Sequence, residues 1–142
     1  MPTASVLLPC YNAAITLEET LETLTAQTLS DFEVIAVNDG STDGTVDILN
    51  RWAKQDLRFH VISQPHAGVV AASNAGIAAC RTPYIARMDA DDRAHPQRLE
   101  KQVAFLDKNH HIAAVSCLVK AFPNSDVGEG FRVLKGAFPI YL

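Results

Sequence analysis

The residues of this chain that could do chemistry gather in three short polar segments, of which the most acidic is Asp89-Ala90-Asp91-Asp92. Carboxylates packed this closely raise one another's pKa and resist full ionisation unless a hard divalent cation takes oxygen ligands from them. In an extended chain, side-chain alternation would send Asp89 and Asp91 to the same side. The segment therefore predicts a divalent cation site, and the alternative is an acidic turn that caps the following helix.

The other two segments are Pro9-Cys10-Tyr11-Asn12 and the polar run from Asn38 to Thr45. Tyr11 offers a flat ring on which a planar base could stack, and the carboxylate of Asp39 can accept hydrogen bonds from imide or ribose donors. Taken singly, Tyr11 could be a half-buried aromatic residue and Asp39 could form an Asx turn. Asp43 is typical of a helix cap. Together, Tyr11 and Asp39 suit a nucleoside.

These segments need an ordered framework, and the apolar pattern predicts one of alternating strands and helices. The expected strands are residues 5–8, 32–37, 59–62, 84–88 and 112–119, and the expected helices are 17–24, 46–55, 68–80 and 96–108. Pro9 should end the first strand, and Thr16 with Glu19 matches a capping box. Continuous apolar strands alternating with helices predict a mostly parallel sheet covered on both faces. All three polar segments then lie at the carboxyl ends of strands, where such sheets bind ligands.

Composition narrows the class of protein. With 142 residues, 48% of them apolar and 20% charged, the chain has the make-up of one globular domain. A net charge of −4 without a basic run argues against a nucleic-acid partner. The three cysteines are far apart in apolar surroundings, which indicates reduced thiols and a cytoplasmic location. No apolar stretch is long enough to span a bilayer, so an association with the cytoplasmic face of a membrane would need parts outside this chain.

The three motifs, in this order and spacing, resemble the amino-terminal half of the family 2 glycosyltransferases. The resemblance rests on Pro9 to Asn12, Val37 to Asp43, and Asp89 to Asp92 followed by His95-Pro96 and Arg98-Leu99. It implies a GT-A fold, a Rossmann-like three-layer sandwich truncated here at its C-terminal side, with residues 1–142 forming the donor half of a catalytic domain. It also implies inverting transfer of a sugar from a nucleotide-diphosphate donor, commonly UDP-linked, in cell wall or polysaccharide biosynthesis.

By this resemblance, Pro9, Tyr11 and Asp39 would hold the nucleoside, Asp89 would reach the ribose or the sugar, and Asp91 would ligate Mn²⁺ or Mg²⁺ between the phosphates. The full set of expected donor-binding residues is Pro9, Tyr11, Asn12, Asp39, Ser41, Asn74, Arg87, Asp89, Ala90 and Asp91. The expected partners are a nucleotide-diphosphate sugar, an acceptor hydroxyl on a saccharide, a lipid-linked molecule or a protein, and a second copy of the chain covering an exposed sheet edge.

Two departures from the family pattern bear on activity. The family often has Ala-Arg-Asn where this chain has Ala72-Ser73-Asn74, and Ser73 cannot replace a guanidinium. Arg87 could compensate, or it could simply pair with the nearby carboxylates. The family places its general base downstream of the acidic segment, so the catalytic residue is expected beyond Leu142, and Asp126 and Glu129 are poor substitutes in their sequence context.

The histidines and two rival functions complete the analysis. His95 could touch a metal or phosphate, although His-Pro at a helix start is typical of a cap. The other histidines, His60, His66, His110 and His111, are interpreted as surface or strand-flanking residues. One rival is a module that binds a nucleotide diphosphate without transferring sugar. The other is a receiver-like domain in which clustered aspartates hold Mg²⁺ and one accepts a phosphoryl group.

Overall fold

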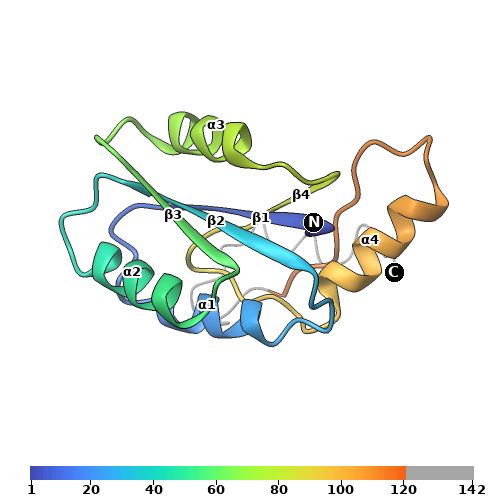
Figure 1. Cartoon of the computed structure of the whole chain (residues 1–142), viewed down its shortest axis with the longest axis horizontal. Coiled ribbons are helices and arrows are strands. Elements are labelled where there is room, and N and C mark those ends of the chain that lie inside the picture. Colours follow the sequence, from blue (N-terminus) through green and yellow to red (C-terminus); the bar gives the residue numbers. More distant parts are fainter. Residues whose placement is uncertain (121–142) are drawn as a thin grey trace. The chain divides into compact units, whose positions relative to one another are not determined.

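The computed structural model describes residues 1–120, so the predictions for Phe122 to Leu142, with Asp126 and Glu129, lie outside the described residues. The chain alternates strictly between strand and helix (Figure 1). The elements are β1 (Ala4–Cys10), α1 (Leu17–Thr25), β2 (Phe32–Asp39), α2 (Thr45–Gln55), β3 (Phe59–Gln64), α3 (Val69–Ala79), β4 (Tyr84–Arg87) and α4 (Arg98–Lys108). The four strands form one sheet in the order β3-β2-β1-β4, and every pair in it is parallel.

Helices cover both faces of this sheet, as the continuous apolar strands predict. Figure 1 shows α3 on one face and α1 and α2 on the other. On β1, Val6, Leu8 and Cys10 belong to the larger core, which also contains the inward leucines of α1 and α2. The opposite face has a smaller core in which Ile35 and Val37 of β2 pack with Ala72 of α3. The prediction of a Rossmann-like α/β layer structure with a parallel sheet is therefore confirmed.

The small residues of α3 allow it to lie close to the sheet. A Cβ atom added at Gly76 would lie 2.2 Å from Cδ1 of Leu7 and 3.0 Å from Cγ2 of Val37. Such distances mean that even a methyl group would overlap the strands beneath. The alanine-rich composition of α3 therefore sets the spacing between helix and sheet.

Pro9 lies inside β1, although its sequence context predicted the end of the strand there. The backbone N–H of Met88 donates to the carbonyl of Leu7, and Pro9, two residues further on, faces the same side of β1. β4 ends at Arg87, which pairs with Leu7, so no β4 residue needs the N–H that proline lacks. β1 therefore continues to Cys10 alongside β2 alone.

Two other local predictions are wrong. Residues 112–120 form no strand, and Leu118 and Val119 are more than 60% exposed; an apolar run becomes a strand only where a neighbouring strand pairs with it. The helix α1 does begin after Thr16, but Thr16 makes no side-chain capping bond. Its hydroxyl instead donates to the carbonyl of Ala90, at 3.0 Å, and Glu19 pairs with Arg93. Tertiary partners have replaced the local capping box.

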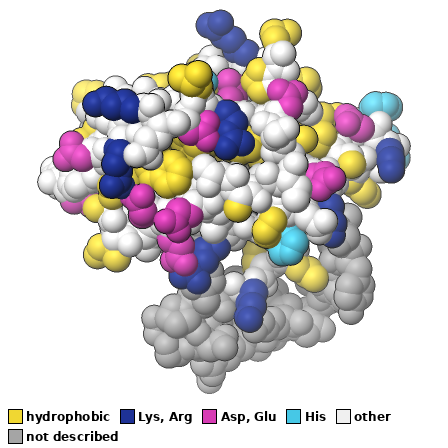
Figure 2. All heavy atoms as spheres, turned by 60° about the horizontal axis from the view of Figure 1, so that its bottom comes forward, with side chains coloured by type: hydrophobic (Ala, Val, Ile, Leu, Met, Phe, Trp, Pro, Cys, Tyr) yellow, Lys and Arg dark blue, Asp and Glu magenta, His cyan; other side chains and the backbone are white. Residues whose placement is uncertain are grey.

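Acidic and basic side chains are interspersed on the face shown in Figure 2. Among the described residues, Arg51 pairs with Glu18 across α1 and α2, and Arg93 pairs with Glu19. Pairs of this exposed kind add little to stability. Within residues 1–120, no helix is long and apolar enough to cross a membrane.

Candidate functional site

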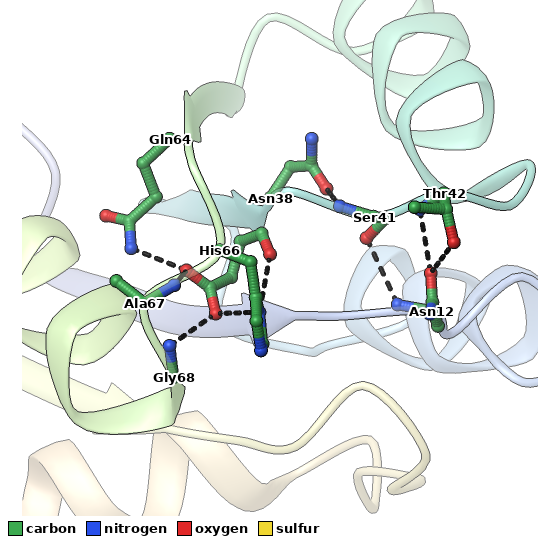
Figure 3. A network of polar contacts seen from close by, with 9 residues as sticks. Asn12, Asn38, Ser41, Thr42, Gln64, His66, Ala67 and Gly68 are labelled. Atoms are coloured by element: carbon green, nitrogen blue, oxygen red, sulfur yellow. Dashed lines mark hydrogen bonds and ion pairs between the residues drawn. The ribbon is translucent and has the colours of Figure 1, made fainter.

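The carboxylate of Asp39, at the end of β2, is the most strongly held polar group at the carboxyl edge of the sheet. Asp39 is 2% exposed. Its Oδ1 accepts hydrogen bonds from Nε2 of Gln64, at 2.6 Å, and from the backbone N–H of Ala67, at 3.0 Å. Its Oδ2 accepts one from the backbone N–H of Gly68, at 2.8 Å, and lies 2.9 Å from Nδ1 of His66 (Figure 3). Asp39 therefore joins the ends of β2 and β3 to the start of α3.

These contacts keep Asp39 ionised. Burial by itself raises the pKa of this carboxyl, but the hydrogen bonds from Ala67, Gln64 and Gly68 and the charge of His66 outweigh burial, so the pKa lies below its ordinary value. The Asx-turn alternative considered for Asp39 is not what forms, because the donors come from residues 25 to 29 positions away. Asp39 is therefore a buried anion at this edge whose hydrogen-bond partners are all N–H donors.

Tyr11 and His66 form a stacked pair beside Asp39. Their ring centroids are 4.0 Å apart and their planes are 23° from parallel. About half of each side chain is exposed. A cavity of about 190 Å³ opens here, and its lining consists of Pro9, Cys10, Tyr11, Asp39, His66, Val69 and Ala72. The structure therefore brings Pro9, Tyr11 and Asp39 to one cavity, as the motifs predicted.

His66 and Gln64 are the members of this cluster that sequence reasoning missed. His66 was interpreted as a surface or strand-flanking residue, but it contacts both Asp39 and Tyr11. A signal was present in the sequence, since Gln64 ends the third strand and His66 follows it, at the edge of the sheet where the other polar segments lie. The third strand was predicted to end at Ile62, two residues before Gln64, and this shortened strand hid the signal.

Asn12 and Ser41 hold two loops together. The backbone N–H of Asn12 donates to Oγ of Ser41, at 3.1 Å, and Oδ1 of Asn12 accepts a bond from the backbone N–H of Thr42, at 2.8 Å (Figure 3). Asn12 has a φ of 48°, a left-handed conformation that asparagine adopts more readily than most residues. Asp43 accepts hydrogen bonds from the backbone N–H groups of Ala14 and of Thr45, the first residue of α2. The N-cap residue of α2 is Gly44, not the predicted Asp43. A direct contact of Asn12 or Ser41 with a donor stays a prediction.

The acidic segment is a turn rather than an extended chain. The backbone N–H of Asp92 donates to the carbonyl of Asp89, at 3.2 Å. The expectation that alternation places Asp89 and Asp91 on one side assumed an extended backbone, and this segment does not have one. Both oxygens of Asp89 contact the guanidinium of Arg87, at 2.5 and 2.6 Å, while Asp91 and Asp92 are exposed. Arg87 is thus the partner of a carboxylate here, one of the two roles considered for it.

Hydroxyl groups on α1 hold this acidic turn in place. The carbonyl of Ala90 accepts hydrogen bonds from Thr16 and Thr20, at 3.0 and 2.9 Å. The hydroxyl of Thr23 accepts one from the backbone N–H of Ala94, and Nε2 of Gln27 donates to the carbonyl of His95. Thr20 and Thr23 lie on α1 and Thr16 and Gln27 flank it, and their spacing of three or four residues puts them on one side of the helix.

The carboxylates at this turn are hard oxygen ligands, which suit Mg²⁺ or Mn²⁺. Among residues 1–120, however, no three His, Cys, Asp or Glu side chains gather as a metal-binding group. Magnesium usually keeps several waters and substrate phosphates among its ligands, so the exposed Asp91 fits a site that a diphosphate completes. Asn74 lies on the exposed side of α3 and is not among the residues that line the cavity.

Comparison with known proteins identifies the family of this chain. The family model described as glycosyl transferase family 2 matches residues 5–132. A relative described as an uncharacterized glycosyltransferase of Haemophilus influenzae is 37% identical over 128 residues, which is 89% of this chain and 40% of that protein. Chondroitin synthase of Pasteurella multocida is 32% identical over 115 residues, covering 81% of this chain and 12% of that enzyme. This chain therefore spans less than half of the length of these relatives.

Solved structures agree with the sequence match. The crystal structure of S. aureus TarS 1–349 in complex with UDP has a TM-score of 0.70 and 28% identity, covering 76% of this chain and 33% of that one. A mannosyltransferase from Pyrobaculum calidifontis, in complex with GDP-Man and Mn²⁺, has a TM-score of 0.74 and 27% identity. The match covers 84% of this chain and 36% of that one. These similarities and the site geometry lead to one conclusion: the chain belongs to the family 2 glycosyltransferases and has their GT-A fold.

Proposed function

We propose that residues 1–142 are the donor-binding part of a catalytic domain that transfers a sugar from a UDP-linked donor to an acceptor hydroxyl with inversion. The observation that carries this proposal is the convergence of Pro9, Tyr11 and Asp39 on one cavity at the carboxyl edge of the sheet. An aromatic ring and a buried carboxylate are the groups that a uracil base needs, because uracil has a π-face and an imide N–H. The neighbouring solved structures contain UDP and GDP-Man, and uracil and guanine both carry a ring N–H next to a carbonyl.

The acidic turn has the chemistry to receive the diphosphate. Asp91 is exposed and free of the Arg87 contact that occupies Asp89. A divalent cation bound by Asp91 and the diphosphate would neutralise the charge of the leaving group. The threonine contacts on Ala90 keep the turn in a fixed position relative to the strand ends. Arg87 could bind phosphate only if its guanidinium left Asp89.

Inverting transfer sets the direction of attack. The acceptor oxygen forms a bond to the anomeric carbon as the bond from that carbon to the diphosphate oxygen breaks, and the hydroxyl proton passes to a general base. The base is expected beyond Leu142. The residues described here have the other task in this reaction, which is to hold the donor so that its anomeric carbon faces the acceptor.

The first test is calorimetric titration of UDP into the protein with and without Mn²⁺. We expect binding that tightens with Mn²⁺, and we expect Asp91→Asn to remove most of the Mn²⁺ effect because it removes one ligand charge. Asp47→Asn, which removes an exposed carboxylate from α2, is the matched control and should leave binding unchanged. A folded wild-type protein that binds neither UDP nor UDP with Mn²⁺ would refute the proposed donor site.

A further inference from the structure

The contacts of Asp39 leave no acceptor position for a nucleobase. A carboxylate has about four lone-pair positions. Here Oδ1 accepts hydrogen bonds from Gln64 and Ala67 and Oδ2 accepts one from Gly68, while Nδ1 of His66 lies against Oδ2 at an ion-pair distance of 2.9 Å. Nδ1 of His66 also lies 3.1 Å from the backbone carbonyl of Asp39. Because both neighbours of Nδ1 are acceptors, Nδ1 must carry a proton and donate. An imide N–H can therefore reach Asp39 only if one of the four donors withdraws.

The stacking face of Tyr11 is covered by the same residue. At a centroid separation of 4.0 Å the rings of Tyr11 and His66 are already in van der Waals contact, so no third ring fits between them. His66 thus covers a face of the ring and an acceptor position of the carboxylate, the two groups to which the proposed nucleoside site assigns base recognition. The imidazole of His66 is planar and has an N–H donor, as the base does, and it occupies the place of that base.

His66 is the donor of the four that can withdraw most easily. The N–H groups of Ala67 and Gly68 belong to the backbone, and Gln64 is a part-buried residue of β3. The side chain of His66 is 52% exposed, so its rotation away from Asp39 carries it into water. Its backbone is held against Gly40, where a Cβ atom would lie only 2.6 Å from the His66 nitrogen. Side-chain rotation, rather than opening of the loop, is the movement that this packing permits.

We infer that His66 is a gating residue of the nucleoside site: it occupies the position of the base on Tyr11 and Asp39, and the base must displace it to bind. The inference rests on the proposed function, since it takes a nucleoside as the ligand. It applies to bases that present an imide N–H, because such a base brings a donor to the carboxylate of Asp39 in place of the Nδ1 of His66. Displacement then exchanges one stack and one hydrogen bond for another of each kind, so His66 lowers affinity without abolishing binding.

The test measures UDP affinity by calorimetry, in the presence of Mn²⁺, for the wild type, His66→Ala and His60→Ala. We expect His66→Ala to bind UDP more tightly by about tenfold, the order of effect expected when a competing stack and hydrogen bond are removed. His60→Ala is the matched control, because His60, on β3, is 54% exposed, much as His66 is, but lies 3.9 Å from Glu33 and does not line the cavity. It should bind UDP as the wild type does.

A second readout follows the rings themselves in the wild-type protein. With labelled histidine and tyrosine, nuclear Overhauser contacts between the Tyr11 and His66 rings should disappear as UDP saturates the site. If UDP binds but His66→Ala binds it equally or less tightly, or the ring contacts persist at saturation, the gating inference is overturned and the donor site stands. If neither the wild type nor His66→Ala binds UDP, the proposed function itself fails.

Discussion

Asp39 is the residue on which the carboxyl edge of the sheet depends. It receives donors from β3, from the segment that follows β3, and from Gly68 at the start of α3. A negative charge at the N-terminus of a helix is favourable, because the backbone N–H groups there have no partner within the helix. The same carboxylate is therefore both a structural anchor and the proposed recognition group, and these two roles can be separated by experiment.

The structural role of Asp39 predicts how stability depends on pH. Its pKa in the folded protein lies below the ordinary value of 3.8, so its contribution to the free energy of unfolding is fully present above that value. The contribution is lost as the pH falls through the lower, folded pKa. In urea unfolding from pH 7 to pH 2, we expect the wild type to lose stability more steeply below about pH 4 than Asp39→Asn does.

Asp43 and Asp56 also have lowered pKa values, and both are present in the wild type and in the variant, so their effects cancel in the comparison. If the free energy of unfolding falls equally steeply with pH in the wild type and in Asp39→Asn, Asp39 does not accept its hydrogen bonds as an anion.

At the scale of elements, α3 determines the shape of the cavity. Val69 and Ala72 on its first turns line the cavity, and Gly76 lies against the strands one turn further along. Intrinsic propensity favours alanine over glycine in a helix by about 1 kcal/mol. Close packing on the sheet opposes that preference at Gly76, because the space for a methyl group is filled by Leu7 and Val37. The two effects have opposite signs, so one substitution decides between them.

We expect Gly76→Ala to destabilise the protein by about 2 kcal/mol, as is usual for an overpacked core. The measurement is the urea midpoint at neutral pH. Ala78→Gly, on the exposed side of α3, reports the propensity effect alone and should cost about 1 kcal/mol. If Gly76→Ala is instead more stable than the wild type, α3 has room to move away from the sheet, and the close helix packing described above is wrong.

At the scale of the whole molecule, the cavity is lined by residues from Pro9 on β1 to Ala72 on α3. A nucleotide that binds only the folded arrangement must therefore stabilise the entire fold by linkage, and one site with ligand at 100 times its Kd adds about 2.7 kcal/mol. We expect UDP with Mn²⁺ to raise the melting temperature of the wild type. Asp39→Asn should show a much smaller rise relative to its own melting temperature in buffer. An equal rise in both proteins would place the nucleotide somewhere other than the cavity at Asp39.

The sequence by itself determined the layered fold and the edge of the sheet at which the polar segments gather. Continuous apolar strands alternate with amphipathic helices. In such a chain the strands are parallel, so the polar segments that follow them lie at one edge of the sheet. The three motifs also led to the correct family, because they occur in this chain in the order and spacing that the family has. Pro9, Tyr11 and Asp39 could be predicted to meet, since each comes at or just after the end of a strand in one sheet.

Tertiary structure alone decided which partner each polar group has. Thr16 could have capped its own helix, but the carbonyl of Ala90 lay within reach of its hydroxyl. Asp89 alternates with Asp91 in sequence, yet the segment forms a turn and Arg87 contacts both oxygens of Asp89. His66 stacks on Tyr11 across 55 positions of sequence because the crossover after β3 returns there. Local pattern encodes burial and periodicity, whereas hydrogen-bond partners depend on distances that exist only after the layers have packed.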